Sequence, residues 1–248
     1  LLGICAAPLL LAAGQAMRGA ANPALQAAIG LIAGNSALFL LTIVPPPPPW
    51  GWLVAALPLL LFLRQPYPDQ PPLAIPTTVW RYLPLVLIYH LSGGLMYGHL
   101  FPAYQQHAVF PGLELFFYVA AVGIAVRLVR NRLEPPLVCG FFFAMLAFSL
   151  LQWGPAVNTG MYAMQTGAGF VDLFLLAFLL HRDLPLRAFA LGNALLCLGL
   201  FAGNLLGRHL DAVPHVIAIA GNLVLYSSLL ILFLATRSTA RPVGTEDE

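Results

Sequence analysis

Long apolar runs, most of them about the length of a membrane span, alternate with short polar or proline-rich breaks along the whole chain. A spanning helix needs about 20 mostly apolar residues. The runs are continuous rather than alternating in polarity, which favours helices over the strands of a membrane barrel. We therefore predict an all-α, polytopic transmembrane bundle of about nine spanning helices. Their expected positions are 1–17, 24–44, 50–63, 82–102, 111–130, 137–153, 158–180, 188–206 and 214–236.

The breaks between the runs divide the chain into four parts. Prolines 45–49 cannot continue a helix because they lack a backbone donor. Residues 64–80 form the longest polar connection, with several prolines among them. The predicted parts are three spanning helices over 1–63, a cytoplasmic loop over 64–80, a six-helix bundle over 81–236 and a cytoplasmic polar tail over 237–248.

Composition supports a lipid environment. Apolar residues make up 60% of the chain and charged residues 8%, whereas soluble domains are nearer half apolar and a quarter charged. Lipid can cover the apolar surface that a soluble fold of this length would expose. The net charge is only +2, so we expect the lipid bilayer, and not nucleic acid, to be a partner of this segment.

The basic residues, all of them arginine, indicate the orientation. If the helices alternate in direction, only Arg208 falls on one side, and the other ten of the 11 basic residues fall on the opposite side. Basic loops are retained in the cytoplasm. The chain is therefore expected to enter from outside, to cross a bacterial inner membrane, and to end in the cytoplasm.

Neither enzymatic nor metal chemistry is indicated. Cys5, Cys139 and Cys197 lie far apart without paired spacing. His99, His107, His209 and His215 are scattered over separate segments without metal-ligand spacing. The chain also contains no nucleophile motif and no phosphate-binding glycine loop. We predict that the protein is not an enzyme and uses no cofactor or metal.

The segment from Gly123 to Arg132, Gly-Ile-Ala-Val-Arg-Leu-Val-Arg-Asn-Arg, partly matches a cytoplasmic transporter signature, Gly-x-x-x-Asp-Arg-x-Gly-Arg-Arg. Gly123 and Arg132 fit the signature, whereas Arg127 stands at its Asp and Arg130 at its second Gly. The order of helices and loops, more than this motif, resembles the major facilitator superfamily. The alternative for the segment is plain retention of arginines in a cytoplasmic loop.

The resemblance implies a facilitator-like fold that is truncated at its N-terminus. An odd number of helices entering from outside is natural if three helices are missing from a twelve-helix protein with both ends inside. The first helix here would be the fourth of twelve, and residues 64–80 would join the two six-helix halves. The Gly123–Arg132 segment would then belong to the cytoplasmic machinery of conformational change.

Two ionisable groups are expected within the membrane, where a charge costs on the order of 2.5–3.5 kcal/mol. Asp172 lies roughly 12 Å from the inner end of its helix, at 1.5 Å per residue. His90 lies at a similar depth in the 82–102 helix. The pair could share a proton or bind a cation or polar solute. In the alternative, Asp172 bonds a neighbouring helix and His90 faces a backbone carbonyl. The resemblance places both on helices that line a central cavity.

Further polar groups are candidates for a pathway of substrate or protons. Glu114 is either a gate at the outer end of its helix or a solvated interfacial carboxylate. Asn35, Gln165 and Asn193 would border the cavity according to the resemblance. Each alone is more often an interhelical hydrogen bond, as are Tyr89, Tyr97, Gln152, Asn204 and Asn222.

Glycines spaced by four predict close helix packing. Gly199, Gly203 and Gly207 share one face of their helix, and Gly94 with Gly98 and Gly30 with Gly34 do the same on two others. Small residues at this spacing let another helix approach closely. Such smooth faces would also permit helices to slide past one another.

These patterns together predict a secondary transporter that moves a small solute by alternating access, coupled to protons through Asp172. The rival class is a membrane sensor. Some bacterial regulators resemble a facilitator-like membrane domain followed by a LuxR-type DNA-binding domain. Substrate, direction of transport and oligomeric state stay open at this point.

Overall fold

The structure is a computed structural model that describes residues 2–45, 47, 50, 75, 77–129, 134–150, 153–181, 184–209 and 214–237. Within those ranges the chain is helical and contains no strand, which confirms the all-α prediction. The helices are α1 (Leu2–Gly19), α2 (Pro23–Ile43), α4 (Thr77–His107), α5 (Leu113–Val129), α6 (Glu134–Leu150), the short 3-10 helix η2 (Gly154–Ala156), α7 (Val157–Leu179), α8 (Leu186–His209) and α9 (Pro214–Arg237).

Two of the predicted segments fall largely outside the described residues. These are the helix over 50–63 and the polar tail beyond Arg237. Most of the loop over 64–80 also lies outside them, but its last residues are described and the prediction is wrong there, because α4 already begins at Thr77. Val79 is fully buried against Leu83 and Ala188, and this packing favours the helix over a loop.

Prolines account for most differences at helix ends. The expected end at Pro102 is wrong, because α4 continues to His107. Asn158 donates a hydrogen bond of 2.9 Å to the backbone oxygen of His107 and so satisfies a group at that helix end. The helix predicted to begin at residue 137 begins three residues earlier, because α6 starts at Glu134. Prolines in the first turn lose no hydrogen bond, so the two that follow Glu134 are tolerated.

In the described part of the chain, four helices are long and apolar enough to cross a membrane: α2, α7, most of α8 and most of α9. Large apolar side chains remain exposed on α2, α8 and α9, where lipid would cover them. α6 is apolar but shorter. These helices support the prediction of a membrane protein.

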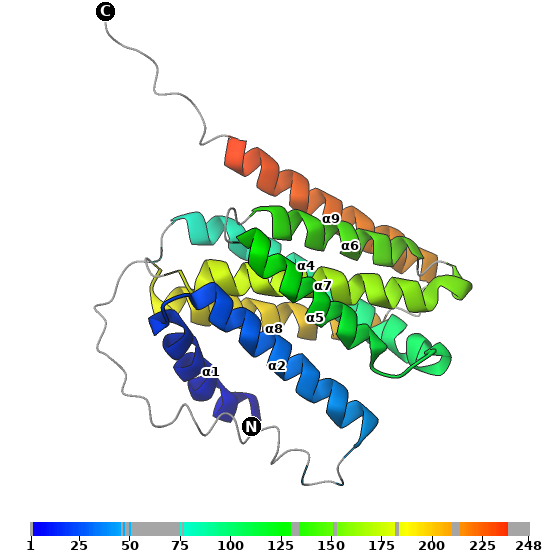
Figure 1. The fold of residues 1–248 in the computed structure, drawn as a ribbon. Coiled ribbons are helices and arrows are strands. Elements are labelled where there is room, and N and C mark those ends of the chain that lie inside the picture. The colour runs from blue at the N-terminus through cyan, green and yellow to red at the C-terminus, as the bar shows by residue number, and fades with distance from the viewer. Residues whose placement is uncertain are drawn as a thin grey trace, which may run out of the picture.

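α7 is the central helix. It contacts α2, α4, α5, α6 and α8, and most of its length is buried. Figure 1 shows it in the middle of the bundle, between helices that run alternately in opposite directions. Glycines permit the closest crossings. A Cβ at Gly167 would lie 2.8 Å from the backbone oxygen of Gly140 on α6, and one at Gly169 would lie 2.6 Å from that of Tyr118 on α5.

The predicted glycine packing is confirmed for the α4–α8 pair. A Cβ at Gly94 would lie 2.9 Å from the backbone nitrogen of Asn204, and Gly203 lies against the backbone of Leu91. For Gly30 and Gly34 the prediction is wrong within the described structure, since a Cβ at either would meet no atom within 4 Å.

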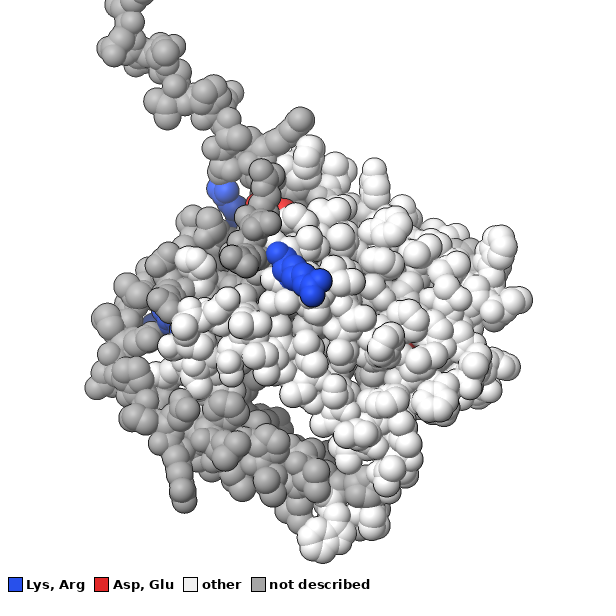
Figure 2. Space-filling view, viewed as in Figure 1, with Lys and Arg blue, Asp and Glu red and all other residues white. Residues whose placement is uncertain are grey.

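The described arginines, apart from Arg208, lie near helix ends at the same end of the bundle. The alternating directions in Figure 1 place the last turns of α1, α5 and α9 and the first turns of α4 and α8 at one end of the bundle. Arg208, near the end of α8, lies at the opposite end. In Figure 2 the blue atoms of the visible face lie at the left and near the middle, and the right side is almost free of charge. The arginines at the first end are Arg18, Arg81, Arg127, Arg187 and Arg237.

Candidate functional site

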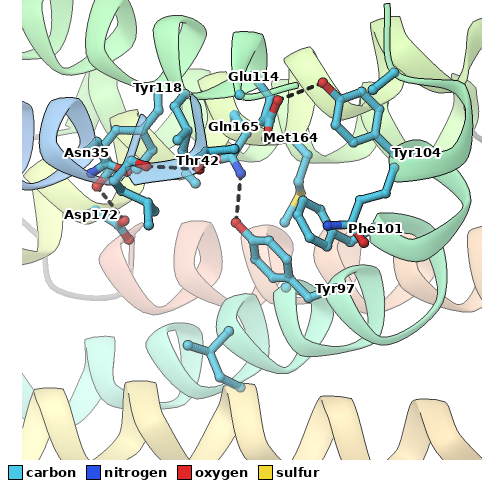
Figure 3. A pocket seen from close by; sticks show the side chains of 18 of the residues that line it. Asn35, Thr42, Tyr97, Phe101, Tyr104, Glu114, Tyr118, Met164, Gln165 and Asp172 are labelled. Atoms are coloured by element: carbon cyan, nitrogen blue, oxygen red, sulfur yellow. Dashed lines mark hydrogen bonds between the residues drawn. The ribbon is translucent and has the colours of Figure 1, made fainter. Parts of the chain in front are cut away.

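A cavity of about 640 Å³ lies between α2, α4, α5, α7 and α8. Its volume is within the range of small-molecule sites. Among the described residues, neither α6 nor α9 contributes to its wall. Apolar side chains make up part of the wall, and Figure 3 shows the polar groups around one shared space. The polar residues are Asn35, Thr42, Tyr89, His90, Tyr97, Tyr104, Gln105, Glu114, Tyr118, Gln165 and Asp172.

The structure brings the two predicted ionisable groups together. His90 on α4 and Asp172 on α7 approach to 3.6 Å between Nε2 and Oδ1. The Tyr118 hydroxyl on α5 donates a 2.8 Å hydrogen bond to Oδ2 of the same carboxylate (Figure 3). The His90 side chain is 6% exposed and that of Asp172 27%. Both side chains line the cavity, and Asp172 is the more exposed of the two.

The hydrogen bonds of His90 determine how the pair can hold a proton. Its Nδ1 lies 2.7 Å from the backbone oxygen of Val86. A carbonyl oxygen only accepts, so Nδ1 carries a proton, and Nε2 of a neutral ring presents a lone pair. That lone pair would face the acceptor oxygens of an ionised Asp172. One proton on either group would convert this unfavourable contact into an attractive one.

Other titratable side chains surround the pair. Tyr118 contacts Asp172 directly, and the Tyr89 ring lies 5.4 Å from that of His90, edge to face. Tyr89 is 3% exposed, and its buried hydroxyl has no hydrogen-bond partner among the described residues. Buried hydroxyls are rarely left unpaired.

A second carboxylate lies in the same cavity. Glu114, in the first turn of α5, is 5% exposed and accepts a 2.6 Å hydrogen bond from the Tyr104 hydroxyl (Figure 3). The alternative of a solvated interfacial Glu is therefore wrong, because neighbouring helices cover the side chain. Between the two acids, Gln165 Nε2 donates to the Tyr97 hydroxyl at 2.9 Å. Tyr97 thus keeps its own hydroxyl proton to donate.

Sequence reasoning missed two of these tyrosines, although a spacing signal was present. Tyr104 completes a series with His90 and Tyr97 at intervals of seven residues, which places all three on nearly one face of α4. Tyr118 follows Glu114 by four residues and shares its face of α5. Both tyrosines lie on the same face as an acid or base already singled out as a candidate.

Of the predicted amides, Asn35 and Gln165 line the cavity and Asn193 does not. Asn35 shares its face of α2 with Leu38 and Thr42, which also line the wall. Asn193 donates to the backbone oxygen of Phe189 on its own helix, at 2.9 Å.

The predicted cytoplasmic segment is only partly described. Gly123 lies within α5 and a Cβ there would meet nothing within 4 Å. Arg127, in the last turn of the same helix, is exposed. Arg130 and Arg132 lie outside the described residues. No described residue ties this segment to the cavity.

The α4–α8 glycine seam supports the position of His90. A Cβ at Gly199 on α8 would lie 3.0 Å from the Cβ of His90 and 2.6 Å from the backbone oxygen of Leu87. This seam is the set Gly94, Gly98, Gly199, Gly203 and Gly207. Because these glycines have no side chains, α8 packs closely against the part of α4 that carries His90.

Comparison with known protein families, with curated proteins and with solved structures found no match. Among the described residues there is also no group of three or more His, Cys, Asp or Glu side chains placed to hold a metal ion.

Proposed function

We propose that this chain is part of a facilitator-type secondary transporter, in which the His90–Asp172 pair binds a proton and couples it to movement of a small solute. The observation that carries the proposal is the pair itself, held at 3.6 Å and accessible from a cavity of about 640 Å³. An ionisable pair inside a membrane bundle is costly and is typically functional.

The helices around the cavity support this proposal. The resemblance to facilitators predicts that the helices equivalent to the family's fifth, seventh, tenth and eleventh border the cavity. Here these are α2, α4, α7 and α8, and each contributes residues to the wall. α5 supplies the remaining side with Glu114 and Tyr118.

In a proton-coupled transporter, protonation must change the side of the membrane from which the cavity is accessible. Tyr118 on α5 and His90 on α4 both contact Asp172 on α7, so a change of charge at Asp172 acts on three helices at once. The other charged or titratable groups of the wall are Tyr89, Tyr97 and Tyr104 on α4 and Glu114 on α5.

The proposal is tested without knowledge of the solute by labelling a cysteine in the cavity wall. Ala108 lines the cavity just beyond α4, and the neighbouring Val109 is 80% exposed. In a cysteine-free background, an impermeant maleimide should label Ala108→Cys at a rate that changes with pH by about tenfold relative to Val109→Cys. Such a ratio corresponds to a bias of about 1.4 kcal/mol between two states.

The adjacent Val109→Cys variant corrects for the pH dependence of the thiol reaction itself. Adding Asp172→Asn to Ala108→Cys should remove the pH dependence, because Asn does not titrate. A ratio that stays constant across the pH range in the unmodified pair would contradict alternating access driven by this site.

A further inference from the structure

We infer that the solute of this cavity is a small monovalent organic cation with an apolar body, and that its charge replaces the proton at the His90–Asp172 pair. This inference rests on the proposed transport function and adds the class of substrate. It is carried by the charge of the wall, its aromatic rings and an unpaired buried hydroxyl.

The cavity wall is acidic. Its described lining includes the carboxylates Asp172 and Glu114 and no Arg, and the chain contains no Lys. Glu114 is bonded only to a neutral phenol among the contacts that the structure describes, at 2.6 Å from Tyr104. A buried carboxylate without a cationic partner is costly. A cation inside the cavity would offset the cost of both acids.

Aromatic rings supply the second feature that favours a cation. Tyr89, Tyr97, Phe101, Tyr104 and Tyr118 all line the cavity. The faces of such rings attract cations, above all quaternary ammonium groups. Met164, Leu196 and Leu200 provide apolar surface for the rest of the molecule.

The third feature is the Tyr89 hydroxyl, which is buried, unpaired and part of the wall next to His90. Its oxygen has almost no exposed surface, so an ammonium group or a water molecule reaches it only when neighbouring side chains move. No other wall hydroxyl in the described structure is both buried and without a partner. The wall beside the proton site therefore has a polar group that no described residue pairs.

The charges of His90, Asp172 and the cation predict that one cation exchanges for one proton. With one proton shared by His90 and Asp172, the pair has no net charge. When an organic cation binds, Asp172 stays ionised and His90 becomes neutral, so the proton leaves and the net charge of the pair together with its cation is again zero. Binding of one cation should release about one proton.

Three probes of equal size and different charge test the inference on the full chain in detergent. They are benzyltrimethylammonium, which is a permanent cation, benzyldimethylamine N-oxide, which is neutral, and benzylsulfonate, which is an anion. We expect the cation to bind about tenfold or more tightly than either of the others, as measured by equilibrium dialysis. In weak buffer its binding should release about one proton per site.

The variants separate the contributing groups. Asp172→Asn should reduce the preference for the cation by about tenfold and abolish the proton release. If that variant does not fold, Glu114→Gln serves instead, and it should weaken cation binding severalfold while leaving the release of the proton in place. Glu134→Gln removes an exposed acid outside the cavity and should change neither value.

The outcomes distinguish this inference from the transport proposal. Absence of cation binding, or equal or tighter binding of the N-oxide or the sulfonate, overturns the substrate class and leaves pH-dependent labelling of Ala108→Cys as the separate test of transport. Tight cation binding without proton release supports the substrate class but overturns the exchange with the proton.

Discussion

Asp172→Asn is expected to abolish proton-driven movement of benzyltrimethylammonium in proteoliposomes, with a loss of about 100-fold or more. The amide can still accept the hydrogen bond of Tyr118, which measures 2.8 Å in the structure. It cannot carry the charge that pairs with protonated His90 or with a cation. Removing one partner of a buried charge pair costs about 2–5 kcal/mol, and about 2.7 kcal/mol corresponds to 100-fold.

The measurement is accumulation of the probe under an imposed pH gradient. Glu134→Gln is the matched control, since it also neutralises an acid but lies exposed at the start of α6. It should transport like the unmodified protein. Coupled transport at the normal rate by Asp172→Asn would remove this carboxylate from the mechanism.

Gly203→Val is expected to disrupt the α4–α8 interface and to destabilise the folded protein by about 3 kcal/mol or more. A Cβ at Gly203 would collide with the backbone oxygen of Leu91 and would lie 2.8 Å from the backbone nitrogen of Leu95. Backbone atoms in a helix cannot rotate away as a flexible side chain can. The two helices must therefore separate, which also moves His90.

The measurement is thermal unfolding in detergent, together with the monodisperse fraction after purification. Gly34→Val provides the control, because it makes the same substitution within a helix at a position where a Cβ meets no described atom within 4 Å. Its effect on helix propensity is the same, so the difference between the two variants reports packing alone. Equal melting temperatures for both variants would show that the seam does not depend on glycine.

Depth along a helix was predictable from the sequence, because each residue advances the helix by about 1.5 Å. That rule placed Asp172 and His90 at one level, and the structure brings them to 3.6 Å. The same rule did not predict the position of Asn193 relative to the cavity. This residue lies on nearly the same face of α8 as Leu200 but outside the cavity. The extent of a cavity along the helix depends on neighbouring helices, which one sequence does not specify.

Contacts between helices were less predictable than the helices themselves. The glycine spacing indicated close packing but could not show that Gly203 lies against Leu91 while Gly34 has no neighbour among the described residues. Burial of Glu114 was likewise hidden, because it depends on Tyr104 of the preceding helix. Proline was misleading at the C-terminal part of α4, where the hydrogen bond from Asn158 to His107 adds support that no local pattern reveals.

Proton-coupled transport by this chain would require His90 and Asp172 together to hold one exchangeable proton. Nitrogen NMR of the His90 ring, assigned with His90→Gln and followed through a pH titration in lipid, tests it most directly. We expect Nδ1 to stay protonated, Nε2 to change its protonation in a single step, and Asp172→Asn to shift this step markedly. A step at Nε2 that is the same with and without the Asp172 carboxylate would show that the two groups do not share a proton.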